Sequence, residues 1–238
     1  MILLNNLFNF SIVIPIFNEE GNIENLIDEI FYHLKGCKNY FEVIIIDDCS
    51  EDNSFKILET IKNKYKVRIY RNKSNMGQSF CIYNGIEKSS FNNIVTIDGD
   101  GQNNPKDILK LLKIYQENNL KLVCGIRKKR KDSFLKIISS KIANKTREFI
   151  LKDKCQDTGC SLKIFDKKVF LLFKYFDGIH RFIPALFSAY SLRNKYVHVE
   201  HRRRKYGSSK YGTIDRLFKG IIDLIRVYKI IRNIKNVN

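Results

Sequence analysis

Short runs of apolar, often β-branched residues alternate with amphipathic segments through the first half of this chain, and this alternation limits the fold more than any other feature. The runs are as short as strands and too uniformly apolar to keep one face in water. Each segment between them has apolar residues at helical spacing. Buried strands separated by helices are typical of an α/β protein with a mainly parallel sheet covered on both faces. The predicted strands are residues 10–16, 41–46, 67–70, 93–97 and 120–125.

The second half of the chain continues this pattern less regularly. Residues 157–165 are predicted to form another strand, and the apolar residues from Ile179 to Tyr190 have the spacing of a helix buried in the core. The chain has 238 residues, 44% of them apolar, which is enough for one α/β domain with a substantial core. No repeat or linker divides it, so we expect a single domain over residues 1–238.

A formal net charge of +18 predicts an anionic partner. Nucleic acid, an anionic lipid surface and a phosphorylated substrate all fit such an excess. Basic stretches lie at 127–131 and 201–205, and the second is followed by small residues and Lys210. Small backbone donors beside cations can wrap a phosphate, so this second stretch is a candidate phosphate clamp.

The C-terminal residues predict a basic amphipathic helix that either docks on the domain or lies on an anionic bilayer; the pattern leaves both open. No run approaches the roughly 18 apolar residues that a spanning helix needs, and no secretory signal is predicted. Six scattered cysteines without a Cys-x-x-Cys pair are expected to be reduced thiols of a cytosolic protein. The predicted apolar face of the helix is Ile214, Leu217, Phe218, Ile221, Leu224, Ile225 and Tyr228.

Two carboxylates, Asp98 and Asp100, close the predicted strand at 93–97. Residues two apart in extended chain point to the same side, so both can approach one ion, while Gly99 and Gly101 let the backbone bend around it. Such oxygen ligands suit Mg²⁺ or Mn²⁺, which share open positions with substrate phosphates. An isolated Asp-Gly-Asp also suits an ordinary turn, so its neighbours must decide.

Polar residues follow several predicted strands, at what becomes the ligand-binding edge of a parallel sheet. Carboxylates gathered there are costly unless a cation or a donor-rich ligand neutralises them. A nucleotide diphosphate with a divalent metal does so, because base and ribose offer donors to Asp47 and Asp48 while the ion joins the diphosphate to Asp98 and Asp100. The residues at this edge are Asn18, Glu19, Asp47, Asp48, Asp98, Asp100 and Arg127.

Seven segments, in this order, resemble family 2 glycosyltransferases with the GT-A (Rossmann-like) fold. Within that family they are most similar to the polyprenyl-phosphate, dolichyl-phosphate mannose synthase-like enzymes. The likeness extends from Ile12 to about Val227. The segments are Val13–Glu19, Ile46–Ser50, Asn75–Gly77, Asp98–Pro105, Asp157–Cys160, His180–Pro184 and Arg202–Tyr211.

The resemblance implies a nucleotide-sugar-binding half at about 10–126, an acceptor-binding half at about 127–212 and an amphipathic helix at about 213–235. The implied nucleotide-sugar positions are Pro15, Asn18, Glu19, Asp47, Asp48, Asp98 and Gln102, and the metal positions are Asp98 and Asp100. The implied positions for the acceptor phosphate are Arg127, Lys136, Ser140, Arg204 and Lys210.

The implied reaction is an inverting displacement in which an oxygen of a polyprenyl phosphate attacks the sugar of GDP-mannose or a UDP-hexose. The residues expected to carry it are Asp98, Asp100, Arg127 and Arg204, with Mg²⁺ or Mn²⁺ as cofactor. The expected place is the cytoplasmic face of a membrane, as a peripheral protein. Many bacterial relatives continue into two membrane helices where only 14 residues follow Leu224 here, so an integral-membrane partner is left open.

Two alternatives remain at this point. A GT-A enzyme acting on a saccharide or another lipid acceptor in cell-envelope glycan synthesis would need a catalytic carboxylate, for which Asp157 is the candidate. A basic nucleic-acid-binding module would explain the charge but not the clustered acids, and no ribonucleoprotein strand or helix-turn-helix pattern is present. We therefore expect no nucleic-acid partner.

Overall fold

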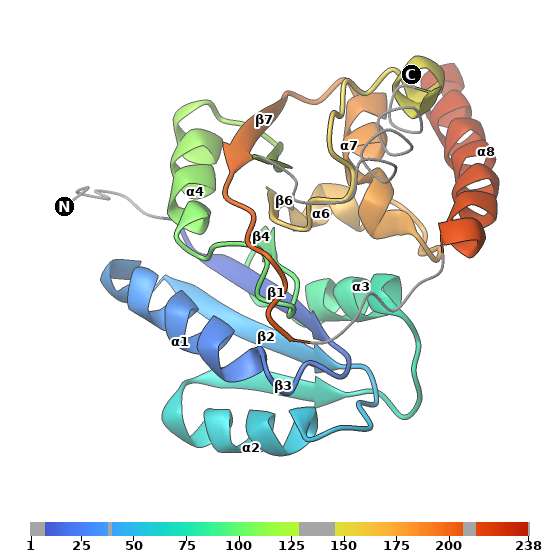
Figure 1. Ribbon diagram of the computed structural model, residues 1–238. Helices are drawn as coiled ribbons and strands as arrows, with labels where there is room; N and C mark the ends of the chain where they lie inside the picture. The colour runs from blue at the N-terminus through green and yellow to red at the C-terminus, as the bar shows by residue number, and fades with distance from the viewer. Residues whose placement is uncertain (1–7, 38–39, 129–145, 207–212, 238) are drawn as a thin grey trace.

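The computed structural model of the protein describes residues 8–37, 40–128, 146–206 and 213–237, the last of these with side chains from 220 to 234. Its centre is a seven-stranded sheet in the order β3-β2-β1-β4-β6-β5-β7 (Figure 1). The strands are β1 (Phe10–Ile16), β2 (Phe41–Asp47), β3 (Val67–Arg71), β4 (Asn93–Thr96), β5 (Leu122–Arg127), β6 (Lys163–Asp166) and β7 (Asn194–Val199).

Helices cover both faces of the sheet, as the continuous apolar runs predict (Figure 1). Alternate residues of one strand serve different layers: Ile12 and Ile14 pack with α1, α2 and α4, whereas Val13 packs with α3 and α7. The helices are α1 (Ile23–His33), η1 (Lys35–Cys37), α2 (Ser54–Lys64), α3 (Gln78–Lys88), α4 (Asp107–Glu117), α6 (Lys167–Phe170), α7 (Ile179–Ala189) and α8 (Thr213–Val237), and residues 146–151 are also helical.

One strand, β6, runs against all its neighbours. It pairs antiparallel with both β4 and β5, whereas every other pairing in the sheet is parallel. The predicted strand at 157–165 is wrong in its first half, because pairing begins only at Lys163. Residues 157–162 instead form a loop, held where Thr96 donates to the carbonyl of Ser161 at 2.6 Å. This loop lies at the sheet edge where the parallel strands end.

Helix α8 docks on the domain by a row of residues other than the predicted apolar face. Asp223, Val227 and Ile231 are buried, and the carboxylate of Asp223 accepts from Arg181 of α7 at 2.7 Å. Of the predicted face, Leu224 packs against the core, whereas Ile221, Ile225 and Tyr228 are exposed. The side chains of Ile214, Leu217 and Phe218 lie outside the described residues. The helix therefore has a docked row and, on the opposite side, an exposed apolar row. In the part of the chain that the structure describes, none of the helices combines the length and apolarity required to cross a bilayer.

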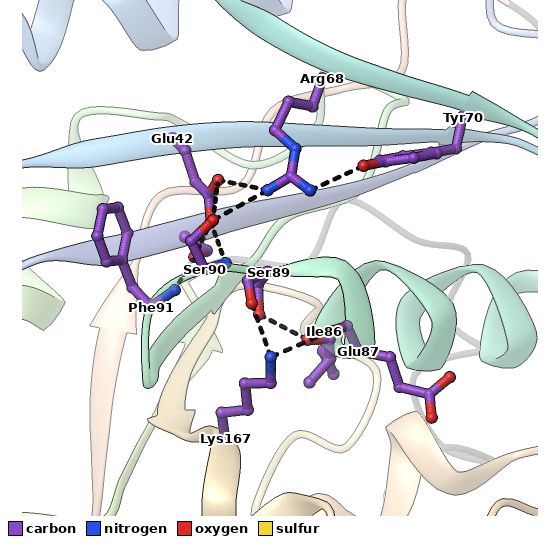
Figure 2. Close-up of polar contacts among 10 residues, drawn as sticks. Glu42, Arg68, Tyr70, Ile86, Glu87, Ser89, Ser90, Phe91 and Lys167 are labelled. Atoms are coloured by element: carbon purple, nitrogen blue, oxygen red, sulfur yellow. Dashed lines mark hydrogen bonds and ion pairs between the residues drawn. The ribbon is translucent and has the colours of Figure 1, made fainter.

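A polar network ties the amino ends of the central strands together, at the edge opposite the acids (Figure 2). Its centre is Glu42, which accepts from Ser11 Oγ at 2.6 Å, from the Ser90 amide at 2.5 Å and from Arg68 Nη1 at 2.8 Å. Arg68 also donates to Tyr70 at 2.8 Å. Burial raises the pKa of Glu42, but these hydrogen bonds outweigh it and the pKa lies below its ordinary value.

We expect Glu42→Gln to lower the free energy of unfolding by about 1–3 kcal/mol at neutral pH, because a charged, half-enclosed acceptor is lost. Folding lowers the pKa of Glu42, so its contribution is present above the ordinary pKa of glutamate and is lost as the pH falls through the lowered value. Urea unfolding of both proteins across this range measures the difference. Glu117→Gln, an exposed carboxylate on α4, is the control. If the difference in unfolding free energy between the wild type and Glu42→Gln stayed the same in acid, the stabilising role of the ionised Glu42 would be contradicted.

Candidate functional site

A guanidinium lies between acids that come from two different strands. Arg204, which follows β7, donates to Oδ2 of Asp100 at 2.7 Å, and its second terminal nitrogen lies 3.4 Å from Oε1 of Glu19. Glu19 follows β1, and Asp100 follows β4. The chain after β7 therefore brings positive charge to the acidic edge of the sheet. The side chain of Arg204 is only 25% exposed there.

Hydrogen bonds to the loop after β4 hold the segment that carries Arg204. The amide of Arg202 donates to the carbonyl of Gln102 at 2.8 Å, and Nε2 of Gln102 donates back to the Arg202 carbonyl at 3.2 Å. Asn104 donates to Glu200 at 2.7 Å, and Arg202 pairs with Glu29 of α1. Gln102, predicted to lie near a sugar diphosphate, thus also places the basic segment beside the acids.

Asp98 has partners that the sequence analysis did not identify. Oδ1 accepts from Nε2 of Gln78 at 2.7 Å, and the amide of Asp98 donates to Oγ of Ser161 at 3.1 Å. Burial and the charge of Asp100 raise the pKa of Asp98 to about 7, against the opposing charge of Lys163. The sequence does contain one signal for Lys163, since a lysine inside an apolar strand is rarely buried without a task.

The two carboxylates fit a hard divalent cation. Asp98 and Asp100 are half-buried side by side, and burial together with the charge of Asp100 raises the pKa of Asp98, so a cation between them would favour the ionised form of both. Within the described residues, no three His, Cys, Asp or Glu side chains converge as a closed metal cage. Two carboxylates with open positions are the donor set by which Mg²⁺ is bound together with substrate phosphates.

A second guanidinium lies at the end of β5. The amide and Nε of Arg127 donate to Oδ2 of Asp157 at 3.0 and 2.8 Å, and Nη2 donates to Oδ1 at 2.7 Å. The charge of Arg127 also lowers the pKa of Asp98, so this guanidinium lies within electrostatic reach of the acid pair. Gly159 leaves room for it, because an added Cβ would come within 2.7 Å of Nη2. Both oxygens of Asp157 are therefore engaged in positioning Arg127.

The acids after β2 have different surroundings. Asp48 accepts from the amides of Met76 and Gly77, each at 2.8 Å, and so shapes the loop that leads into α3. Asp47 pairs with Arg71 at 3.1 Å, while its Oδ1 is buried and receives no hydrogen bond from the described residues. Oδ1 of Asp47 is thus an acceptor without a donor among the described residues, on a side chain that is fully buried, whereas both oxygens of Asp48 accept hydrogen bonds.

The remaining predicted residues divide into two groups. Pro15 lies half-buried in β1, and Asn18 joins the loops after β1 and β2, since its Oδ1 accepts from the Glu51 amide at 2.8 Å. Lys136, Ser140 and Lys210 lie outside the described residues. The structure thus brings together the predicted residues Glu19, Asp98, Asp100, Gln102, Arg127 and Arg204.

Comparison with known sequences gives one family. The profile of Glycosyl transferase family 2 matches residues 11–172. The dodecaprenyl-phosphate galacturonate synthase of Rhizobium johnstonii is 37% identical over 224 residues, which are 91% of this chain and 65% of that protein. The undecaprenyl-phosphate 4-deoxy-4-formamido-L-arabinose transferase of Proteus mirabilis is 30% identical over 218 residues, 90% of this chain and 66% of that protein. The chain thus spans slightly less than two thirds of these curated relatives.

Solved structures share the fold. Glucosyl-3-phosphoglycerate synthase from Mycobacterium tuberculosis, in complex with Mn²⁺, uridine diphosphate and phosphoglyceric acid, superposes with a TM-score of 0.67 at 16% identity, covering 92% of this chain and 77% of that one. S. aureus TarS 1–349 in complex with UDP superposes with a TM-score of 0.62 at 13% identity, covering 94% of this chain and 65% of that one.

Proposed function

Since the chain belongs to glycosyl transferase family 2 and has the GT-A fold, we propose that it transfers a sugar from a nucleotide sugar to the phosphate of a polyprenyl lipid. The observation that carries this proposal is the mixture of charges at one sheet edge: Asp98 and Asp100 lie within reach of the guanidiniums of Arg127 and Arg204. Acids suit a metal-bound diphosphate, and guanidiniums suit a second phosphate. The names of the similar sequences support the same acceptor class.

On the donor side, Asp98 and Asp100 would hold a divalent cation, Mg²⁺ or Mn²⁺, which supplies charge neutralisation to the departing diphosphate. Glu19 and Asn18, after β1, and Asp47, at the end of β2, offer acceptors to the base and ribose. Oδ1 of Asp47 accepts no hydrogen bond from the described residues, which supports a role for this carboxylate in binding the nucleotide. Asp48 would act by holding the loop of Met76 and Gly77 in place.

On the acceptor side, Arg127 and Arg204 would orient the attacking phosphate and offset its repulsion from the donor diphosphate. A phosphate monoester is already an anion at neutral pH, so no strong general base is needed. Asp157, the carboxylate that a saccharide acceptor would require as a base, binds Arg127 with both oxygens instead. This engagement favours the phosphate acceptor. Lys136, Ser140 and Lys210 are proposed to complete the acceptor site.

Such a reaction takes place where a polyprenyl chain is embedded, and the protein is therefore proposed to act peripherally at the cytoplasmic face of a membrane. The excess of positive charge supports attraction to anionic lipid. An integral-membrane partner is compatible with this arrangement but is not required by it.

A transfer assay tests the function. Purified protein is incubated with Mg²⁺ or Mn²⁺, a panel of radiolabelled UDP- and GDP-sugars and undecaprenyl phosphate in liposomes. We expect label from one donor to enter the organic phase and chelation of the metal to abolish it. Metal-dependent nucleotide binding without transfer from any donor would contradict the acceptor assignment.

A further inference from the structure

The exposed side of α8 combines apolar and basic residues. Ile221, Ile222, Ile225 and Tyr228 are 50%, 59%, 53% and 45% exposed. They project on the side of the helix away from the docked row of Asp223, Val227 and Ile231. Large apolar side chains grouped on one helix and left in water mark a surface that another phase or molecule covers.

The charges around this apolar row have one sign. Lys229 and Arg232 are exposed on the same side of the helix, and Arg226 at its margin is also exposed although its Nη1 lies 3.6 Å from Oδ1 of Asp223. Asp223 is the single acid between residues 220 and 234, and it is buried against Arg181. Isoleucine with surrounding cations and no exposed acid is complementary to an anionic bilayer surface, where apolar side chains enter the acyl boundary and cations meet headgroup phosphates.

The helix also connects to the acidic edge of the sheet through the start of α7. Asp223 binds Arg181 at 2.7 Å, and the neighbouring His180 shares a hydrogen bond of 2.7 Å with Ser79 of α3. Ser79 follows Gln78, which donates to Asp98. The docked side of α8 is thus linked, through α7 and the start of α3, to the side chain that donates to Asp98.

We propose that the exposed row of α8, consisting of Ile221, Ile222, Ile225 and Tyr228 with Arg226, Lys229 and Arg232, lies in the surface of an anionic membrane. This inference rests on the proposed function, because it explains how a protein with this site reaches an acceptor held in a bilayer. The two faces of α8 would then have different roles: the buried row packs against the domain, and the exposed row binds the lipid surface.

Vesicle co-sedimentation tests the inference. Phosphatidylcholine vesicles with and without phosphatidylglycerol are mixed with the wild type, with the double variant Ile222→Ser, Ile225→Ser, and with the double variant Lys229→Gln, Arg232→Gln. We expect each variant to bind the anionic vesicles roughly tenfold more weakly than the wild type. Tyr32→Ser is the matched control, because Tyr32 is 67% exposed on α1, at the other face of the sheet. Circular dichroism melting verifies that each variant is folded.

A water-soluble, short-chain isoprenyl phosphate separates this inference from the proposed function. We expect both α8 variants to transfer sugar to it at the wild-type rate and to lose transfer to acceptor in vesicles. Wild-type protein that uses the soluble acceptor but does not bind vesicles would overturn the inference and leave the function intact. Binding through α8 without transfer to either acceptor would support the inference and refute the function. Variants that lose self-association but keep vesicle binding would assign the row to a second copy and overturn it.

Discussion

Asp98→Asn and Asp100→Asn are each expected to reduce sugar transfer by roughly a thousandfold or more, because each removes a charge that would hold the cation on the departing diphosphate. The asparagine at 98 keeps the oxygen that accepts from Gln78, so the fold around it is preserved. We therefore expect the rate of sugar transfer to fall while the free energy of unfolding changes little. Titration calorimetry of Mn²⁺ in the presence of UDP or GDP, whichever the wild type binds, provides the direct measurement, and we expect the binding heat to disappear in both variants.

The control for these variants is Glu117→Gln, which removes one negative charge from an exposed position on α4. It should bind Mn²⁺ and transfer sugar like the wild type. Either variant at the acid pair that retains both metal binding and transfer would remove the metal assignment from that residue. A variant that binds metal normally but transfers nothing would show that the residue acts on the sugar or on Arg204 instead.

Arg204→Ala is expected to lower kcat by about 100-fold to 1000-fold, because a preorganised cation is lost from the place where the two phosphates of the proposed reaction would meet. In the structure, Arg204 binds Asp100 and lies near Glu19, so it competes with any other cation for those oxygens. We therefore expect Mn²⁺ in the absence of nucleotide to bind the variant at least as tightly as the wild type. Measuring kcat beside the Mn²⁺ affinity separates a catalytic role from a structural one.

Arg193→Ala is the matched control, since Arg193 is an exposed arginine just before β7, at the opposite end of that strand from Arg204. It removes an equal charge and should change kcat little. Weaker Mn²⁺ binding in Arg204→Ala would contradict the prediction, because it would mean that the guanidinium mainly holds the acids in place. Asp157→Asn adds a test of the acceptor: we expect transfer to fall only partly, because Arg127 loses a charged partner but keeps one acceptor oxygen, whereas loss of a general base would cost about 100-fold to 10,000-fold.

The sequence predicts the α/β layers well but not the strand order. Each apolar run from 10–16 to 120–125 forms a strand within about two residues of the prediction, because burial on both faces leaves an unmistakable apolar run. An apolar run does not encode direction, however, so the antiparallel β6 could not be recognised. Strand β7 was not predicted, because it lies at the edge of the sheet and only Val197 and Val199 of its six residues are buried.

In the candidate site, too, features encoded by local sequence could be predicted and features that depend on the topology could not. Asp98 and Asp100 could be predicted to lie together because they are neighbours in sequence, and Arg204 because it lies in a recognisable segment. Their partners were not found: Gln78 and Ser161 reach Asp98 from 20 and 63 residues away in the chain. Hydrogen bonds over such separations depend on the topology and leave no local pattern in the sequence.

The position of β6 between β4 and β5 has a mechanical consequence. Because β6 pairs with β4 on one side and with β5 on the other, backbone hydrogen bonds set the spacing between Asp98, which follows β4, and Arg127, which ends β5. A hinge that opened these two positions would have to break the sheet. The sheet therefore fixes the separation between these two positions, and adjustment to proposed substrates of different size would fall to side chains. The sheet itself would thus set the relative positions of the two proposed phosphorylated substrates.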